Sequence, residues 1–373
     1  MKKKIALIVS VPVTFDAFYQ NHIKALQEKY DVTLIANFDQ EAPVFDGVKQ
    51  ISINLERKPS IFSDLKTLRK MIAIFRKEKF VLIHSTTPKA GFITQIAGFI
   101  TGTKFRLHIF TGQVWASQSG IKRQALKKVD VAIASLATHL LADSKSQVDF
   151  LISESIPVDY KIKVLGEGSI SGVDLEKFSP KNTDDLKIKL GLMDKSFVFL
   201  FIGRLNKDKG IFDLIKSFEL VQAKYPNTAL LIVGSDEENI IPFIEAHKLY
   251  GESVFYHSAT PRPQDFMAMA DMLCLPSYRE GFGTVVIEAA ACGTPTIGSR
   301  IYGLSDAIVD GKSGYLFPVG SIDSLADKMF YGIENPEILQ QASEYGMKRA
   351  KENFSDELSS GLLVDYYKSI LED

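Results

Sequence analysis

Two glutamates, Glu280 and Glu288, stand with seven residues between them in the stretch LPSYREGFGTVVIEAAACG. Gly281 and Gly283 allow the chain to turn sharply there and bring backbone N–H groups close to a ligand. The run that follows favours a helix, whose N-terminus attracts anions. Thr284 and Glu288 share one face of that helix, so they can line a pocket from a diphosphate to sugar hydroxyls. Two isolated glutamates would be interpreted as solvated surface residues, but the glycine turn favours a site.

A second charged group lies in the loop GRLNKDKG, which follows the apolar run Phe199–Ile202 and precedes a predicted helix. Fixed guanidinium and ammonium groups can stabilise the negative charge of a phosphate or diphosphate without a metal. We expect the cations of this loop to face a ligand cleft. The alternative is a polar loop with ordinary exposed cations.

The glutamate pair, with LPSYREGFG ahead of it and EAAACGTPTIGS after it, resembles the donor site of the family 4 glycosyltransferases of GT-B fold. The resemblance implies that Glu280 lies beside the transferred sugar and that Glu288 holds the ribose of a sugar nucleotide. It also implies that Arg204 and Lys209 meet the diphosphate as catalytic cations, with Lys207 a bystander. The implied donor-binding residues are Gly203, Arg204, Lys209, Glu280, Gly281, Phe282, Gly283, Thr284 and Glu288.

No metal site is expected, because the sequence lacks an Asp-x-Asp motif and any cluster of His, Cys or carboxylate residues at metal-ligand spacing. The dinucleotide fingerprint G-x-G-x-x-G also fails, since Val286 stands where the third glycine is required. We therefore expect no metal and no dedicated cofactor. A nucleotide sugar, with UDP as the expected nucleotide, would be the co-substrate.

His108 is a further catalytic candidate in the front half. The family tends to place a His followed by Gly at the cleft end of a middle strand, but in RLHIFTGQVW the residue before Gly112 is Thr111. Whether His108 or Thr111 faces the cleft stays open, and a structural strand His is the alternative. The family's Gly-rich loop after the first strand is also missing here, which leaves donor contacts from that loop in doubt.

Short β-branched runs alternate with amphipathic segments in both halves, a pattern typical of doubly wound parallel sheets. Between them, the linker GSISGVDLEKFSP resembles the interdomain segment of the same family. We predict a GT-B fold of α/β class, with two Rossmann-like domains that face a central cleft. The expected parts are an acceptor-binding domain over 1–180, a donor-binding domain over 181–354, and a helix over 355–373 that can return to the first domain.

The composition indicates a globular protein, with 46% hydrophobic residues in a chain long enough for two cores. Cys274 and Cys292 stand in apolar surroundings, which favours free buried thiols and a reducing cytoplasm. The first residues, MKKKIALIVSV, are too short for a membrane span and carry no small-residue cleavage site, so they predict a β-strand.

Charge is unevenly distributed. Residues 1–170 hold 24 Lys and Arg against 15 Asp and Glu, which leaves 20 against 30 for the rest, so the front half is basic. Two predicted helices carry much of this charge, at Lys66, Arg69, Lys70, Arg76, Lys77 and Lys79, and at Lys122, Arg123, Lys127 and Lys128. Such faces suit an anionic membrane or a lipid diphosphate, although a solvated helix surface explains each cluster equally well. No aromatic-interleaved basic motif indicates nucleic acid.

These features predict a retaining glycosyltransferase that moves a sugar from a UDP-sugar to a glycan acceptor, expected to be lipid-linked, in the cytoplasm or on the inner face of the cell membrane. The segments LPSYREGFG and SRIYGLSDA resemble those of bacterial surface-polysaccharide transferases, which implies O-antigen, capsule or exopolysaccharide synthesis. Two alternatives remain: an epimerase or hydrolase of nucleotide sugars with this fold, and a catalytically silent nucleotide-sugar-binding protein. The intact set of predicted charged residues argues against the silent protein.

Overall fold

The chain folds into two compact α/β units. The computed structural model describes residues 2–38, 45–55 and 60–372. The first unit comprises Met1–Gly172 together with Asp356–Asp373, and the second comprises Val173–Ser355, so the second unit starts ahead of residue 181. Each unit is built on a parallel sheet with helices on both faces, which confirms the predicted fold class.

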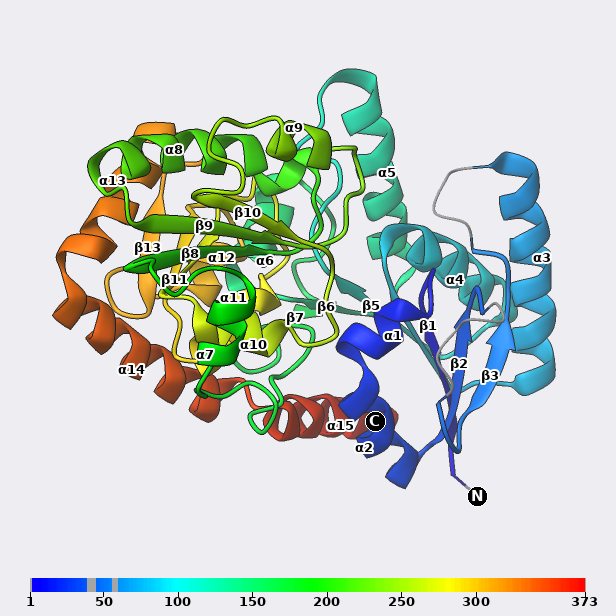
Figure 1. The fold of residues 1–373 in the computed structure, drawn as a ribbon. Coiled ribbons are helices and arrows are strands. Elements are labelled where there is room, and N and C mark those ends of the chain that lie inside the picture. The colour runs from blue at the N-terminus through cyan, green and yellow to red at the C-terminus, as the bar shows by residue number, and fades with distance from the viewer. Residues whose placement is uncertain (1, 39–44, 56–59, 373) are drawn as a thin grey trace. The chain divides into compact units, whose positions relative to one another are not determined.

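In the first unit, the described strands form one parallel sheet in the order β3-β2-β1-β4-β5-β6-β7 (Figure 1). The strands are β1 Lys4–Ile8, β2 Asp31–Ala36, β3 Lys49–Ser52, β4 Leu82–Thr86, β5 Phe105–Phe110, β6 His139–Ala142 and β7 Ile162–Lys163. The helices are α1 Val13–Phe18, α2 Gln20–Lys29, α3 Ile61–Glu78, α4 Pro88–Thr101, α5 Gly120–Leu136, α6 Lys145–Ser153 and α15 Asp356–Glu372.

The side chains of β1 alternate between the two faces of the sheet and show which helices cover each face. Ile5 and Leu7 are buried with the apolar faces of α2 and α15, whereas Ala6 and Ile8 are buried with those of α3 and α4. Successive side chains of a strand point to opposite faces, so a fully apolar strand requires helices on both sides. This is the physical reason for the doubly wound arrangement.

Helix α15 is an integral part of the first unit although it comes last in the chain. It packs against α2. The Tyr367 hydroxyl lies 2.6 Å from Nδ1 of His84 on β4, and the Ser360 hydroxyl lies 2.9 Å from Nδ1 of His22 on α2. Burial lowers the pKa of His84 to about 3, so this ring is neutral at physiological pH. Neutral buried rings and hydroxyls therefore hold α15 in place.

In the second unit, the described strands form a parallel sheet in the order β10-β9-β8-β11-β12-β13 (Figure 1). The strands are β8 Phe197–Ile202, β9 Thr228–Val233, β10 Val254–His257, β11 Met272–Leu275, β12 Thr296–Ser299 and β13 Gly314–Phe317. The helices are α7 Asp184–Lys189, the 3₁₀ turn η1 Lys207–Lys209, α8 Ile211–Lys224, α9 Ile241–Glu245, α10 Pro263–Met269, α11 Thr284–Ala291, α12 Leu304–Ala307, α13 Ile322–Glu334 and α14 Pro336–Asn353.

The centre of the second sheet is the point where the strand order reverses. Every residue of β8 is buried, as its continuous apolar sequence FVFLFI predicts for a strand covered on both faces. The chain proceeds from β8 to β9 on one side and from β11 to β12 on the other. The chain therefore continues in opposite directions along the sheet after β8 and after β11, and open α/β sheets bind ligands at such a switch point.

Within the described ranges, no helix combines the length and the apolar character needed to cross a membrane.

Candidate active site

Of the predicted charged residues of the second unit, Arg204, Lys209 and Glu280 lie on the two loops at its switch point. The β8 loop runs from Gly203 through η1, and the β11 loop runs over 276–283. Because β8 and β11 are paired in parallel, with Met272 beside Phe199, both loops leave the same edge of the sheet. The sheet topology therefore brings together two motifs that are far apart in the sequence.

Gly210 allows these two loops to approach closely, and Gly283 allows the β11 loop to pack against α12. Gly210 ends η1 with φ +69°, and a Cβ there would lie 2.2 Å from the carbonyl oxygen of Pro276. Gly283 precedes α11 with φ +89°, and a Cβ there would lie 2.7 Å from Leu304. Both positions combine left-handed backbone with tight packing, which only glycine tolerates.

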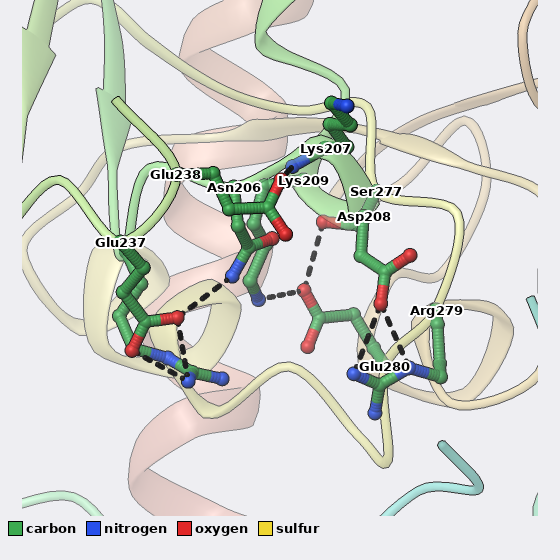
Figure 2. Close-up of polar contacts among 10 residues, drawn as sticks. Asn206, Lys207, Asp208, Lys209, Glu237, Glu238, Ser277, Arg279 and Glu280 are labelled. Carbon is green, nitrogen blue, oxygen red and sulfur yellow. Dashed lines mark hydrogen bonds and ion pairs between the residues drawn. The ribbon is translucent and has the colours of Figure 1, made fainter. Parts of the chain in front are cut away.

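Lys209 and Glu280 form a direct ion pair between the two loops (Figure 2). The Ser277 hydroxyl donates a second hydrogen bond to the same Glu280 oxygen, Oε1, at 2.8 Å. The side chains of Lys209 and Glu280 are only 17% and 12% exposed. The structure thus places a cation predicted for the diphosphate beside the carboxylate predicted for the sugar, and one oxygen of that carboxylate carries both contacts.

Arg204 is held by a carboxylate that the sequence did not single out. Its Nη1 lies 3.0 Å from both oxygens of Glu237, and Nδ2 of Asn206 donates to Glu237 at 3.1 Å. Backbone bonds fix this arrangement, since Leu205 N–H donates to Ser235 and Glu237 N–H donates to Leu205. Three consecutive acidic residues after β9 were the available signal, but their neighbour could be known only from the pairing of β8 with β9.

The Arg204–Glu237 pair leaves Arg204 able to change partners. The Arg204 side chain is 52% exposed, and an exposed ion pair contributes at most about 1 kcal/mol. Breaking this pair so that Arg204 contacts another anion would therefore cost little.

Lys207, the predicted bystander, contacts Glu238 only through its backbone N–H in the described contacts, at 2.9 Å.

Glu288 lies on α11 and is half-buried. Burial raises the pKa of its carboxyl to about 7, and the nearby charge of Lys177 opposes this shift. Within the described part of the chain, no side chain pairs or hydrogen-bonds with the Glu288 carboxylate. Thr284, one turn earlier, is also half-buried, and the rest of the helix is apolar. A carboxylate in such surroundings gains from a ligand hydroxyl that donates to it.

Phe282 can offer a ligand only its backbone. Its side chain is fully buried and packs against Phe354 at 5.4 Å between ring centroids. This contact anchors the turn between the two glutamates to the end of α14.

His108 of the first unit has the surroundings of a packing residue. The residue is 2% exposed on β5, and Nδ1 lies 2.9 Å from the Ser85 hydroxyl. A Cβ added to Gly91 of α4 would lie 2.5 Å from the ring, which shows how closely the helix covers it. Burial lowers the pKa of His108 to about 3. The structure thus favours the alternative of a structural strand His, and Thr111 after β5 is half-buried.

Among residues 2–38, 45–55 and 60–372, no three His, Cys, Asp or Glu side chains are grouped so as to hold a metal ion. Cys274 and Cys292 are both buried free thiols, as the sequence predicted.

Two doubly wound parallel units, one with cations and carboxylates on the loops at its switch point, define the architecture of a GT-B glycosyltransferase. Comparisons agree: residues 182–349 match the model of the glycosyl transferases group 1, and residues 19–167 match that of a glycosyl transferase 4-like domain. A capsular polysaccharide biosynthesis glycosyltransferase of Staphylococcus aureus is 32% identical over 359 residues, which cover 95% of this chain and 94% of that protein. The chain belongs to family 4 of the glycosyltransferases.

Two more distant proteins bear on the fold and on ligands. The UDP-Gal:alpha-D-GlcNAc-diphosphoundecaprenol alpha-1,3-galactosyltransferase of Escherichia coli is 27% identical over 317 residues, 81% of this chain and 80% of that protein. The crystal structure of HepE from Anabaena in complex with UDP matches with a TM-score of 0.80 and 19% identity, covering 99% of this chain and 100% of that one. At this identity the likeness shows the fold.

Proposed function

We propose that this glycosyltransferase transfers a sugar from a UDP-sugar to a lipid-linked glycan, with retention of configuration, in the synthesis of a bacterial surface polysaccharide. The observation that carries the proposal is the contact of Lys209 with Glu280, supported by Ser277. A transferase needs a cation at the leaving diphosphate and a carboxylate at the sugar, and this pair offers both within one contact.

The reaction we propose separates charge along the bond that breaks. Negative charge grows on the diphosphate as the sugar leaves, and Arg204 with Lys209 stabilises it without a metal ion. Positive charge grows on the oxocarbenium-like sugar, and Glu280 stabilises it. The acceptor hydroxyl attacks from the face that the diphosphate leaves, so the configuration is retained. These interactions are strongest in the transition state, which is where they accelerate the reaction.

The donor nucleotide is assigned to α11. Glu288 accepts hydrogen bonds from the ribose hydroxyls, and the N-terminus of α11 at Gly283 and Thr284 lies toward the phosphates. Two findings support UDP: the Anabaena structure contains it, and the Escherichia coli relative is named for UDP-Gal. The name of that relative also includes a diphosphoundecaprenol-linked GlcNAc, which supports a lipid diphosphate as the carrier of the acceptor.

The first unit offers a surface suited to peripheral binding at the inner face of the cell membrane. Phe62 near the start of α3 and Ile121 near the start of α5 are each 89% exposed. The basic cluster of α3 and its C-cap is exposed at Lys66, Arg69, Lys70, Arg76, Lys77 and Lys79. Exposed apolar side chains next to basic ones bind anionic lipid surfaces.

The basic cluster on α5 is smaller than its sequence implies. Arg123 and Lys127 both pair with Glu154, at 2.6 and 2.7 Å, and lie over the ring of Trp115. Lys122 and Lys128 remain exposed. The membrane-facing charge that we propose therefore comes mainly from α3.

The test is turnover of a panel of nucleotide sugars with undecaprenyl-diphosphate saccharides, followed by NMR of the anomeric linkage. We expect transfer from a UDP-sugar with retention. Release of free sugar without an acceptor would identify a hydrolase, and UDP binding without turnover of any donor would identify a silent binder. An inverted linkage would contradict the assigned mechanism.

A further inference from the structure

A second ion pair lies next to the Lys209–Glu280 pair, with the acidic residue on the β8 loop and the basic residue on the β11 loop. Asp208 on η1 accepts from Nη2 and Nε of Arg279 at 3.1 and 3.3 Å (Figure 2). Consecutive residues of the β8 loop, Asp208 and Lys209, thus meet consecutive residues of the β11 loop, Arg279 and Glu280. On the β8 loop the acidic residue Asp208 precedes the basic residue Lys209, whereas on the β11 loop the basic residue Arg279 precedes the acidic residue Glu280.

This alternation selects one register between the loops. A shift by one residue would bring Lys209 to Arg279, or Asp208 to Glu280, and like charges would then repel. The backbone supports the same register, because Tyr278 N–H donates to the Asp208 carbonyl at 2.8 Å. The side chains of Asp208 and Arg279 are 32% and 20% exposed, so water screens their attraction only in part.

The two pairs face different tasks when a donor binds. In the proposed function Lys209 contacts the diphosphate and Glu280 contacts the sugar, so a bound donor replaces the contact between these two side chains. Asp208 and Arg279 have no such role, and their two hydrogen bonds can persist. Both bonds end on one oxygen of Asp208, Oδ2, so two donors of the planar guanidinium hold a single acceptor.

Resting on the proposed function, we propose that Asp208 and Arg279 are positioning residues for sugar transfer. The pair keeps the two loops in register while the donor occupies Lys209 and Glu280, so that cation and carboxylate stay at the two ends of the bond that breaks. The pair acts through Lys209 and Glu280 and does not itself touch the donor.

The decisive experiment is a double-mutant cycle on UDP affinity, measured by calorimetry. Lys209→Met should weaken UDP binding about tenfold in the parent protein, but less than about threefold when Asp208→Asn is already present, because Lys209 is then no longer positioned. At saturating donor, Asp208→Asn should also lower kcat about tenfold. Exchange of the two charges, Asp208→Arg with Arg279→Asp, should restore only a small part of the Lys209 contribution, because it keeps an attraction at this position but removes the alternation that selects the register.

Glu334→Gln is the matched control. It breaks the Lys224–Glu334 ion pair, 2.6 Å long, which joins α8 to α13 in the same unit. We expect it to change neither UDP affinity nor kcat. If Asp208→Asn does not fold, Arg279→Lys keeps the charge but loses the two-bond geometry, and it should give the same cycle with a smaller kcat loss.

The outcomes separate this inference from the proposed function. If the parent protein neither binds UDP nor transfers a sugar, the proposed function is wrong. If UDP binds and Lys209→Met costs the same factor with and without Asp208, the positioning role is wrong while the proposed function stands.

Discussion

Replacement of Glu288 by Gln should stabilise the protein and weaken its donor binding, and both effects should depend on pH. The carboxyl of Glu288 has an ordinary pKa of 4.5 and a pKa of about 7 in the folded protein. Between these values the unfolded chain loses the proton and the folded chain keeps it. The free energy of unfolding therefore falls as pH rises from 4.5 to 7, and stays lower above 7.

The size of this effect follows from the shift. Each pKa unit corresponds to about 1.4 kcal/mol, so a shift from 4.5 to about 7 means that an ionised Glu288 destabilises the folded protein by at most about 3.5 kcal/mol at pH 8. Its partial exposure makes the true value smaller. Glu288→Gln removes the ionisation, so the variant should gain stability at pH 8 and almost none at pH 4.5. The apparent Tm at both pH values, from calorimetry of parent and variant, measures this difference.

Donor binding should change in the opposite direction. If the ionised carboxylate accepts the ribose hydroxyls, Glu288→Gln should weaken UDP binding by roughly 1.5–3 kcal/mol at pH 8. With a pKa of about 7, roughly one tenth of Glu288 is ionised at pH 6 and nine tenths at pH 8. The advantage of the parent over the variant should thus shrink about tenfold at pH 6. Protonation of UDP itself affects its binding to both proteins equally. The ratio of the two UDP affinities at each pH therefore reports the ionisation of Glu288 alone.

Two results would refute this reasoning. Equal UDP affinity of parent and variant at pH 8 would remove Glu288 from the ribose site. A Tm difference that is the same at pH 4.5 and pH 8 would show that burial does not raise its pKa.

Three further predictions concern chemistry, metal and membrane. Glu280→Ala should leave UDP affinity nearly unchanged while kcat at saturating donor falls on the order of a hundredfold or more; a folded variant with near-native kcat would identify a structural loop Glu. Turnover should persist in the presence of a chelator, whereas complete loss that magnesium or manganese restores would overturn the role of Arg204 and Lys209. In liposome flotation the protein should bind anionic vesicles at low salt, release as salt screens the charge, and bind less after Phe62→Ser; equal binding to neutral vesicles would contradict the role of the α3 cluster.

The fold was predictable where side-chain pattern alone decides structure. Strand β8, Phe197–Ile202, contains the apolar run ahead of GRLNKDKG, and helix α8, Ile211–Lys224, is the helix predicted after it. Both were predictable because each has a long and consistent apolar pattern. Strand β3, Lys49–Ser52, was not predicted, since an edge strand reading KQIS is half-buried and carries little apolar signal.

The candidate site was predictable as residue types and not as contacts. Spacing pointed to Glu280 and the family resemblance to Lys209, but only the pairing of β8 with β11 shows that they touch. The same holds for Glu237, which reaches Arg204 because β9 lies next to β8. Burial of His108 depends on how closely α4 covers β5, which a single sequence does not reveal.

The place of α15 in the fold also sets an order of events during synthesis. A ribosome completes Val173–Ser355 before α15 emerges, so the second unit has all of its residues while the first still lacks a helix. Until then the side of the first sheet that carries His84 has no Tyr367 to cover it. Domains usually fold in the order in which they are made. In this protein the first unit is synthesised first but can complete its fold only after the second unit has been synthesised. During that time the apolar face that α15 will cover stays without its helix.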